Sequence, residues 1–190
     1  SLDEVIAVEA SVPMKNLLDS ARSNTGVATL QAGYQDVRYT GKNVVVGVID
    51  TGIDYSRSDF DNTDGDSRVQ YLRFQSASAD GVTITECAND AIREGSCEIS
   101  DDNDKTAGHG THVTGVAKSA DIMLVRNDFY LEDIDEEKDI SFTAGVLDGV
   151  VEIFKKADIL DKPAVINISQ GTHIGAHDNT SLLEEGINDA

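Results

Sequence analysis

The stretch NVVVGVID (residues 43–50) decides the fold class of this 190-residue chain. Its nearly continuous run of β-branched side chains is typical of a strand that is buried on both faces in a parallel sheet. The run ends in Asp50, and the turn residues Thr51 and Gly52 follow. Open α/β sheets place their functional sites at this carboxyl edge. Asp50 is therefore a candidate site residue, although on its own it would be interpreted as a turn or helix-capping aspartate.

Helix-like and strand-like segments alternate regularly from residue 109 onward. The expected elements are helices at 109–120 and 140–158, strands at 121–127 and 163–169, and a last helix at 181–190. Ser181 and Glu184 form a capping box at the start of that last helix. The alternation predicts an α/β fold with a mainly parallel sheet flanked by helices. Region 54–108 has one strand-like segment, at 68–75, and is otherwise expected to form polar loops and insertions.

The composition excludes several classes of function. Thirty-five acidic residues against fifteen basic ones give a net charge of −20, which repels phosphate backbones and anionic membrane surfaces. We therefore expect no nucleic-acid partner. No apolar run reaches the roughly eighteen residues of a membrane span, and the first ten residues lack the features of a signal peptide. We expect a soluble protein.

Cys87 and Cys97 stand ten residues apart in the polar segment CANDAIREGSC. This close pair in a loop-like segment predicts a local disulfide, as in exported proteins, and two independent free thiols are the alternative. Zinc binding is not expected here, because the segment has no CxxC spacing and no nearby histidine.

The stretch TAGHGTHVTG (residues 106–115) allows three interpretations. Its glycines give GxGxxxxG after an acidic segment, which fits neither the spacing nor the context of a dinucleotide loop. His109 and His112 would share a helical face, but the HExxH pattern of a zinc protease is absent. The third interpretation is acid–base catalysis, in which a buried carboxylate orients an imidazole. Asp50 is the natural candidate for that carboxylate.

Three segments together resemble a known family. VVVGVIDTGID (44–54), GHGTHVTGVA (108–117) and PAVINISQG (163–171), in this order, resemble the aspartate, histidine and substrate-cleft segments of the subtilisin-like serine proteases. The resemblance implies a subtilisin-like three-layer fold and a secreted endopeptidase that acts on protein or peptide substrates. It also implies that Asp50 is the triad aspartate and His109 the general base.

The same resemblance assigns further residues. It implies that His112 is a structural histidine near the site. Asn167, Ser169 and Gly171 would line the primary specificity pocket and pair with an extended peptide. Many family members have leucine where this chain has Gln170, which predicts a more polar pocket edge.

A structural calcium ion is the one cofactor that the resemblance suggests, and no organic cofactor is implied. Asp59 matches a family aspartate that often binds calcium, but Arg57 and Ser58 replace the usual His-Pro before it. Oxygen ligands are abundant in DFDNTDGDS (59–67), although the segment is not an EF-hand. A solvated acidic loop is the alternative.

The resemblance also divides the chain. Residues 1–40 resemble the junction between an inhibitory propeptide and the catalytic domain, so the propeptide is an expected partner. Residues 41–190 resemble the N-terminal half of the peptidase domain, with an acidic, cysteine-containing insertion at about 79–105. His173 and His177 are expected in a solvated loop beside the cleft.

The 190 residues contain no GTSMA-like segment and no counterpart of the oxyanion asparagine. The nearest look-alike of the nucleophile segment, NTSLL (179–183), lacks the glycine, and Ser181 is better explained as a helix cap. We therefore expect a domain truncated before its later strands and inactive by itself. Its exposed sheet edge would pair with the missing C-terminal half or with a second copy. The alternative is a catalytically inactive module that binds a peptide or a partner.

Overall fold

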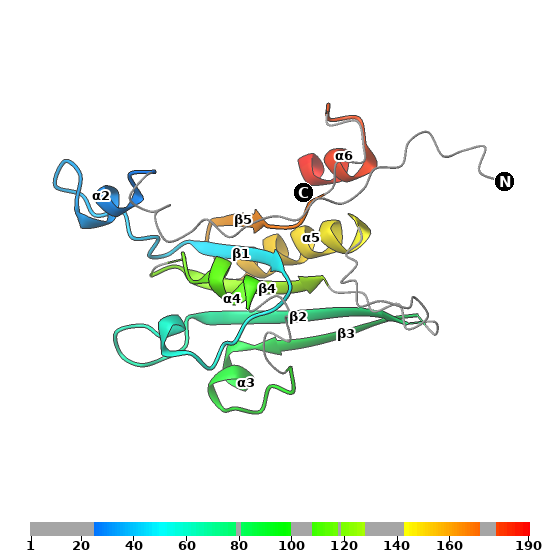
Figure 1. The fold of residues 1–190 in the computed structure, drawn as a ribbon, viewed down its shortest axis with the longest axis horizontal. Coiled ribbons are helices and arrows are strands. Elements are labelled where there is room, and N and C mark those ends of the chain that lie inside the picture. The colour runs from blue at the N-terminus through cyan, green and yellow to red at the C-terminus, as the bar shows by residue number, and fades with distance from the viewer. Residues whose placement is uncertain (1–24, 79–80, 100–107, 118, 128–142, 172–177) are drawn as a thin grey trace.

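The computed structural model describes residues 25–78, 81–99, 108–117, 119–127, 143–171 and 178–190 (Figure 1). The strands are β1 (Val45–Asp50), β2 (Val69–Ser78), β3 (Gly81–Ala88), β4 (Asp121–Asn127) and β5 (Ala164–Ile168). The helices are α2 (Val27–Ala32), the 3-10 turn η1 (Ser58–Phe60), α3 (Asn89–Arg93), α4 (His109–Thr114), α5 (Thr143–Ile159) and α6 (Leu182–Asp189). None of these helices is long and apolar enough to cross a membrane. Residues 1–24 of the propeptide-like region lie outside the described part of the chain.

The five strands form one mixed sheet in the order β3-β2-β4-β1-β5 (Figure 1). β1 pairs in parallel with β4 on one side and with β5 on the other. β2 is parallel to β4 and antiparallel to β3. The α/β prediction with a mainly parallel sheet is confirmed, and the strand predicted at 121–127 matches β4 residue for residue.

The insertion is more ordered than its polar composition indicated. Region 54–108 was expected to hold one strand among loops, but β2 continues to Ser78 and forms a long hairpin with β3. The stretch VTIT (82–85) consists of β-branched residues that alternate between apolar and hydroxyl-bearing side chains, which suits a strand. The surrounding acidic residues concealed this alternation.

Helices pack on both faces of the sheet, which gives three layers. On one face, α5 and α6 cover side chains of β1 and β4; that core contains Val45, Ile49, Met123, Val125, Val146, Val150 and Ile153. On the other face, α3 and α4 lie against a second core; its members include Val48, Phe60, Leu72, Ile92, Ile122 and Leu124. β1 contributes to both cores, as its continuous apolar run predicted.

Glycines allow α5 to approach β1 closely. A Cβ atom on Gly149 of α5 would lie 3.0 Å from Ile49 Cδ1, and one on Gly47 of β1 would lie 2.7 Å from Ile153 Cγ2. Larger side chains at either position would push the helix away from the strand. This close packing fixes the position of β1 and therefore of the residue at its end.

One helix is shorter than predicted, and another begins where it was predicted. The helix expected at 109–120 ends at Thr114, because Gly115 caps it and a turn at Val116 and Ala117 follows. The last helix, α6, begins as predicted: Ser181 Oγ accepts the backbone N–H of Glu184, and the Glu184 carboxylate accepts the backbone N–H of Ser181. Ser181 therefore serves as the helix cap.

β5 lies at one edge of the described sheet, as the sequence predicted. Its residues alternate between half-buried and exposed, and Val165 is 63% exposed. An exposed apolar side chain on an edge strand provides a surface for pairing with another chain.

Arg68 connects the loop before β2 to the segment after α4. Its guanidinium donates to the backbone carbonyls of Ala117 (2.8 Å), Ala120 (2.7 Å) and Asp59 (3.0 Å). Partial burial lowers the pKa of Arg68, because desolvation disfavours the charged form. A planar group with several fixed donors suits this set of carbonyls better than an ammonium would.

Replacing Arg68 with Lys is expected to lower the free energy of unfolding by roughly 1–3 kcal/mol, because at least one carbonyl loses its charged donor. Urea unfolding followed by circular dichroism measures the change. The matched control is Arg57→Lys, since Arg57 makes an exposed ion pair with Asp59. Equal stability of the two variants would contradict the role assigned to Arg68.

Candidate active site

Asp50 is the last residue of β1 and has no exposed surface. A buried carboxylate must receive hydrogen bonds to offset its loss of hydration. Asp50 Oδ1 accepts the backbone N–H of Thr51 at 2.8 Å and the Thr51 hydroxyl at 3.2 Å. Oδ2 has no hydrogen-bond partner within the described part of the chain. All the hydrogen bonds described for this carboxylate therefore converge on Oδ1.

His109, the first residue of α4, completes that set. Its Nδ1 lies 2.8 Å from Asp50 Oδ1, and its side chain is 31% exposed. An acceptor-only carboxylate at this distance requires the Nδ1–H tautomer, which places the basic lone pair of the neutral ring on Nε2. The structure thus brings the two sequence-predicted residues together, with the carboxylate buried and the imidazole partly open to solvent.

A close approach between two backbones holds this pair. A Cβ atom on Gly110 would lie 2.1 Å from the carbonyl oxygen of Gly52, so α4 packs directly on the turn after β1. The Gly110 N–H donates to Thr51 Oγ1 at 3.2 Å, and the Asp54 N–H donates to Thr111 Oγ1 at 2.8 Å. Sequence analysis gave Thr111 and Gly110 no role. Both residues stand between His109 and His112, and the signals that the sequence offered were the missing side chain of Gly110 and the hydroxyl of Thr111.

The residues predicted to bind substrate lie at the same edge as Asp50, because β1 and β5 are parallel. Asn167 Nδ2 donates to Ser169 Oγ at 2.7 Å. Asn127, at the end of β4, donates from Nδ2 to Gln170 Oε1 at 3.4 Å. Gln170 is half-buried, whereas Asn167, Ser169 and Gly171 are exposed. Their binding role stays a prediction.

Known proteins share the sequence pattern and the fold of this chain. The sequence model of the subtilase family (peptidase S8) matches residues 41–182, which is most of the chain. The chain belongs to the subtilase family. Among solved structures, the fold is similar to that of the CspB protease of Clostridium perfringens, with 24% identity and a TM-score of 0.68. The match covers 90% of this chain and 37% of that protein. No curated protein matches the chain at a significant level.

The other candidate residues of this subtilase are three histidines and the proposed calcium ligand Asp59. His112 is exposed on α4, and no cluster of three or more potential metal ligands occurs among the described residues. His173 and His177 lie outside the described part of the chain. Asp59 Oδ2 accepts two hydrogen bonds from Arg57, at 2.7 and 3.0 Å, and its side chain is 63% exposed. Arg57 thus pairs with one oxygen of this carboxylate, and calcium binding at Asp59 stays a prediction.

The predicted disulfide is present. Cys87 at the end of β3 is bonded to Cys97, with their Cα atoms 5.7 Å apart. Cys97 also accepts a hydrogen bond on its carbonyl from the Tyr55 hydroxyl at 3.4 Å. Because Tyr55 lies shortly after Asp50, the disulfide connects the insertion of this subtilase to the loop that leaves the candidate site.

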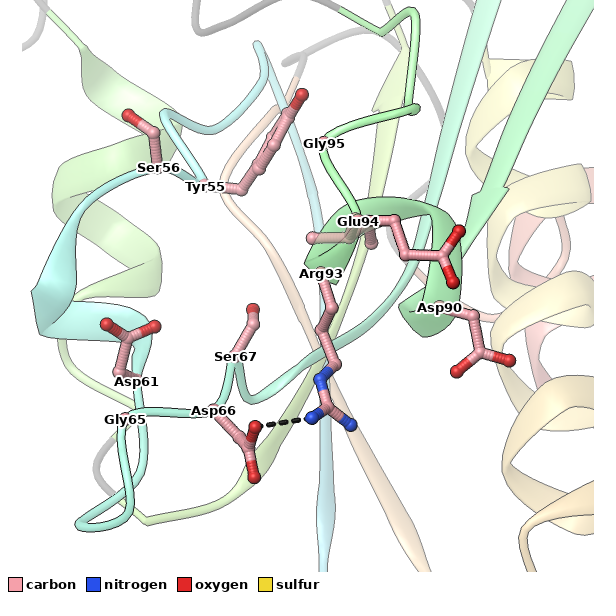
Figure 2. Close-up of a pocket in the computed structure, with 11 residues that line it drawn as sticks. Tyr55, Ser56, Asp61, Gly65, Asp66, Ser67, Asp90, Arg93, Glu94 and Gly95 are labelled. Atoms are coloured by element: carbon pink, nitrogen blue, oxygen red, sulfur yellow. Dashed lines mark hydrogen bonds and ion pairs between the residues drawn. The ribbon is translucent and has the colours of Figure 1, made fainter.

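A cavity of about 920 Å³ opens between that loop and α3 (Figure 2). Figure 2 shows the side chain of Arg93, from α3, pointing toward Asp66. Arg93 Nη2 and Asp66 Oδ1 form an ion pair at 2.5 Å. The lining of the cavity includes neither Asp50 nor His109. The cavity is thus separate from the candidate site and lies between the loop after β1 and the insertion, and the sequence did not predict it.

Replacing Gly110 with Ala is expected to move α4 away from the turn, because the new methyl group would overlap the Gly52 carbonyl. The contact between Asp50 and His109 should lengthen. Proton NMR of the His109 Nδ1–H, whose signal depends on this hydrogen bond, measures the change.

Gly115→Ala is the control, since the nearest atom to its Cβ would be 3.3 Å away. An unchanged Nδ1–H signal in Gly110→Ala would show that the close approach does not position the pair.

Proposed function

We propose that this chain supplies the aspartate and the general base of a subtilisin-like serine endopeptidase. The observation that carries the proposal is the 2.8 Å contact between the buried Asp50 carboxylate and His109 Nδ1. Asp50 lies at the carboxyl end of a parallel strand, where α/β folds bind their ligands. Membership of the subtilase family supports protein or peptide substrates.

In the proposed mechanism, the nucleophile is a serine outside these 190 residues. Its oxygen attacks the scissile carbonyl carbon while His109 Nε2 takes the hydroxyl proton. The resulting imidazolium then gives that proton to the leaving amine as the peptide C–N bond breaks. Water repeats the cycle on the acyl-enzyme, again with His109 as the base. Asp50 holds the Nδ1–H tautomer and stabilises the imidazolium through its charge.

The substrate is proposed to bind as an extended strand at the carboxyl end of β5. Residues 169–171 continue past the last paired residue of β5, so their backbone groups can pair with a peptide. This pairing fixes the peptide by main-chain hydrogen bonds, while side chains of the cleft select its sequence. The 190 residues alone are expected to be inactive, because they include neither the serine nor the oxyanion asparagine of the family pattern.

The disulfide supports a proposal about location. The sequence has two cysteines in all, Cys87 and Cys97, and they are bonded to each other. Disulfides persist in oxidising compartments, so we propose that the protein is secreted.

His109→Ala in the full-length protein is expected to reduce peptide hydrolysis by about 10⁶-fold, because the serine loses its base. Asp50→Asn should reduce it by about 10⁴-fold, because the imidazole loses the partner that sets its tautomer. Hydrolysis of a quenched fluorescent peptide measures both.

His112→Ala is the matched control on the same helix and should stay within a few-fold of wild type. Full activity of His109→Ala would contradict the proposal. Peptide binding without hydrolysis by the wild-type protein would instead favour the inactive binding module.

A further inference from the structure

The cavity of about 920 Å³ between the loop after β1 and α3 is in the size range of small-ligand pockets (Figure 2). Tyr55 and the buried Ile92 give its lining an aromatic ring and an apolar side chain. The charged groups of the lining are the carboxylates of Asp61, Asp66, Asp90 and Glu94 and the guanidinium of Arg93. This excess of negative charge beside apolar surface suits a ligand that carries a cation on an aliphatic stem.

The wall that α3 forms is fixed before any ligand arrives. α3 lies within the loop that the disulfide between Cys87 and Cys97 closes. Asn89, the first residue of α3, donates from Nδ2 to the backbone carbonyls of Val69 (2.6 Å) and Ser67 (3.2 Å). Ser67 itself lines the cavity, so these hydrogen bonds join the two walls. A ligand would not need to order α3, and preorganisation of this kind favours binding.

The opposite wall is a tight turn. Asn62 Oδ1 accepts the backbone N–H groups of Asp64 (2.8 Å) and Asp66 (3.0 Å). The Asn62 N–H donates in turn to the Asp66 carbonyl at 2.8 Å. The turn therefore fixes the backbone that carries the Asp66 carboxylate, which lies beside the Arg93 guanidinium in Figure 2.

Arg93 shows which interaction this cavity favours. Its Nη2 pairs with Asp66 Oδ1 at 2.5 Å. The side chains of Arg93 and Asp66 are 47% and 49% exposed, so solvent screens the pair and it contributes little to stability. A guanidinium from a ligand can therefore take the place of Arg93 at Asp66.

Asp61 offers a second carboxylate to the same ligand. It is half-buried, and its carboxylate has no hydrogen bond or ion pair within the described part of the chain. Arg68 is close by, but it donates to the backbone carbonyl of Asp61, at 3.4 Å. Partial removal of a carboxylate from water without a donor is unfavourable, and a cationic ligand would supply the donor.

We propose that this cavity binds an arginine side chain of a peptide or protein segment, which pairs with Asp61 and Asp66 and displaces Arg93 from Asp66. The fork of donors on a guanidinium can pair with carboxylates from two directions, which an ammonium does less well. The two carboxylates of the α3 wall strengthen the negative potential, and the aromatic and apolar side chains of the lining pack on the stem. The inference does not depend on endopeptidase activity, because the cavity is separate from the candidate active site.

The test measures binding of a five-residue peptide, an arginine between two pairs of glycines, by fluorescence polarisation. The peptide is blocked at both ends and carries a neutral fluorophore, and its matched partner has citrulline in place of arginine. All samples are full-length protein with His109→Ala, so hydrolysis does not consume the peptide. The arginine peptide is expected to bind about tenfold more tightly than the citrulline peptide, and added salt should weaken its binding.

Three further substitutions locate the site. Asp61→Asn and Asp66→Asn should each weaken binding of the arginine peptide by about tenfold, as for one charge-assisted hydrogen bond. Arg93→Gln should strengthen it several-fold, because the competing guanidinium is removed. Asp64→Asn is the matched control and should leave binding unchanged, since it removes the same charge from the same turn but does not line the cavity.

Equal binding of the arginine and citrulline peptides would overturn the inference. An equal loss in Asp64→Asn and Asp66→Asn would also overturn it, because the net charge of −20 would then attract the peptide without a defined site. Binding that is no stronger in Arg93→Gln would overturn the displacement of Arg93 and the inference with it. Asp61→Asn decides the outcome if Asp66→Asn fails to fold, since the Asp61 carboxylate holds no other described residue in place.

Discussion

The hydrogen bond between Asp50 and His109 depends on one steric constraint, the contact of Gly110 with the Gly52 carbonyl. Only a residue without a side chain lets α4 begin so close to the turn after β1. Thr51 then fills the remaining space with a hydroxyl that donates to Asp50 and accepts from the backbone of α4. The carboxylate is therefore oriented by the same atoms that hold the helix, so packing and site geometry cannot be varied separately.

The rest of the fold keeps β1 fixed beneath this contact. Parallel neighbours on both sides and apolar cores on both faces leave the strand no freedom to shift. α5 approaches it through Gly149, and the disulfide of the insertion reaches the loop after Asp50 through Tyr55. A charged group buried at the end of such a strand has a fixed position before any substrate arrives. Preorganisation of this kind is what acid–base catalysis requires.

The features of this structure that depend on local sequence patterns could be predicted from the sequence. The β-branched run of β1, the capping box at Ser181 and the cysteine spacing each express a local rule, and each is confirmed. The β3 strand was missed because its alternation is short and surrounded by acidic residues. The hydrogen bond from Asn127 to Gln170 could not be predicted, since it joins two segments that are brought together by the order of the strands in the sheet. Long-range contacts of that kind leave no local pattern in the sequence.

The central claim is that the Asp50–His109 pair activates a serine that these 190 residues do not contain. Fluorophosphonate labelling of the full-length protein, followed by mass-spectrometric mapping of the modified residue, tests it most directly. The account predicts one labelled serine outside this chain, with labelling lost in His109→Ala. Labelling of a serine within the chain, such as Ser169 or Ser181, or no labelling at all, would contradict it.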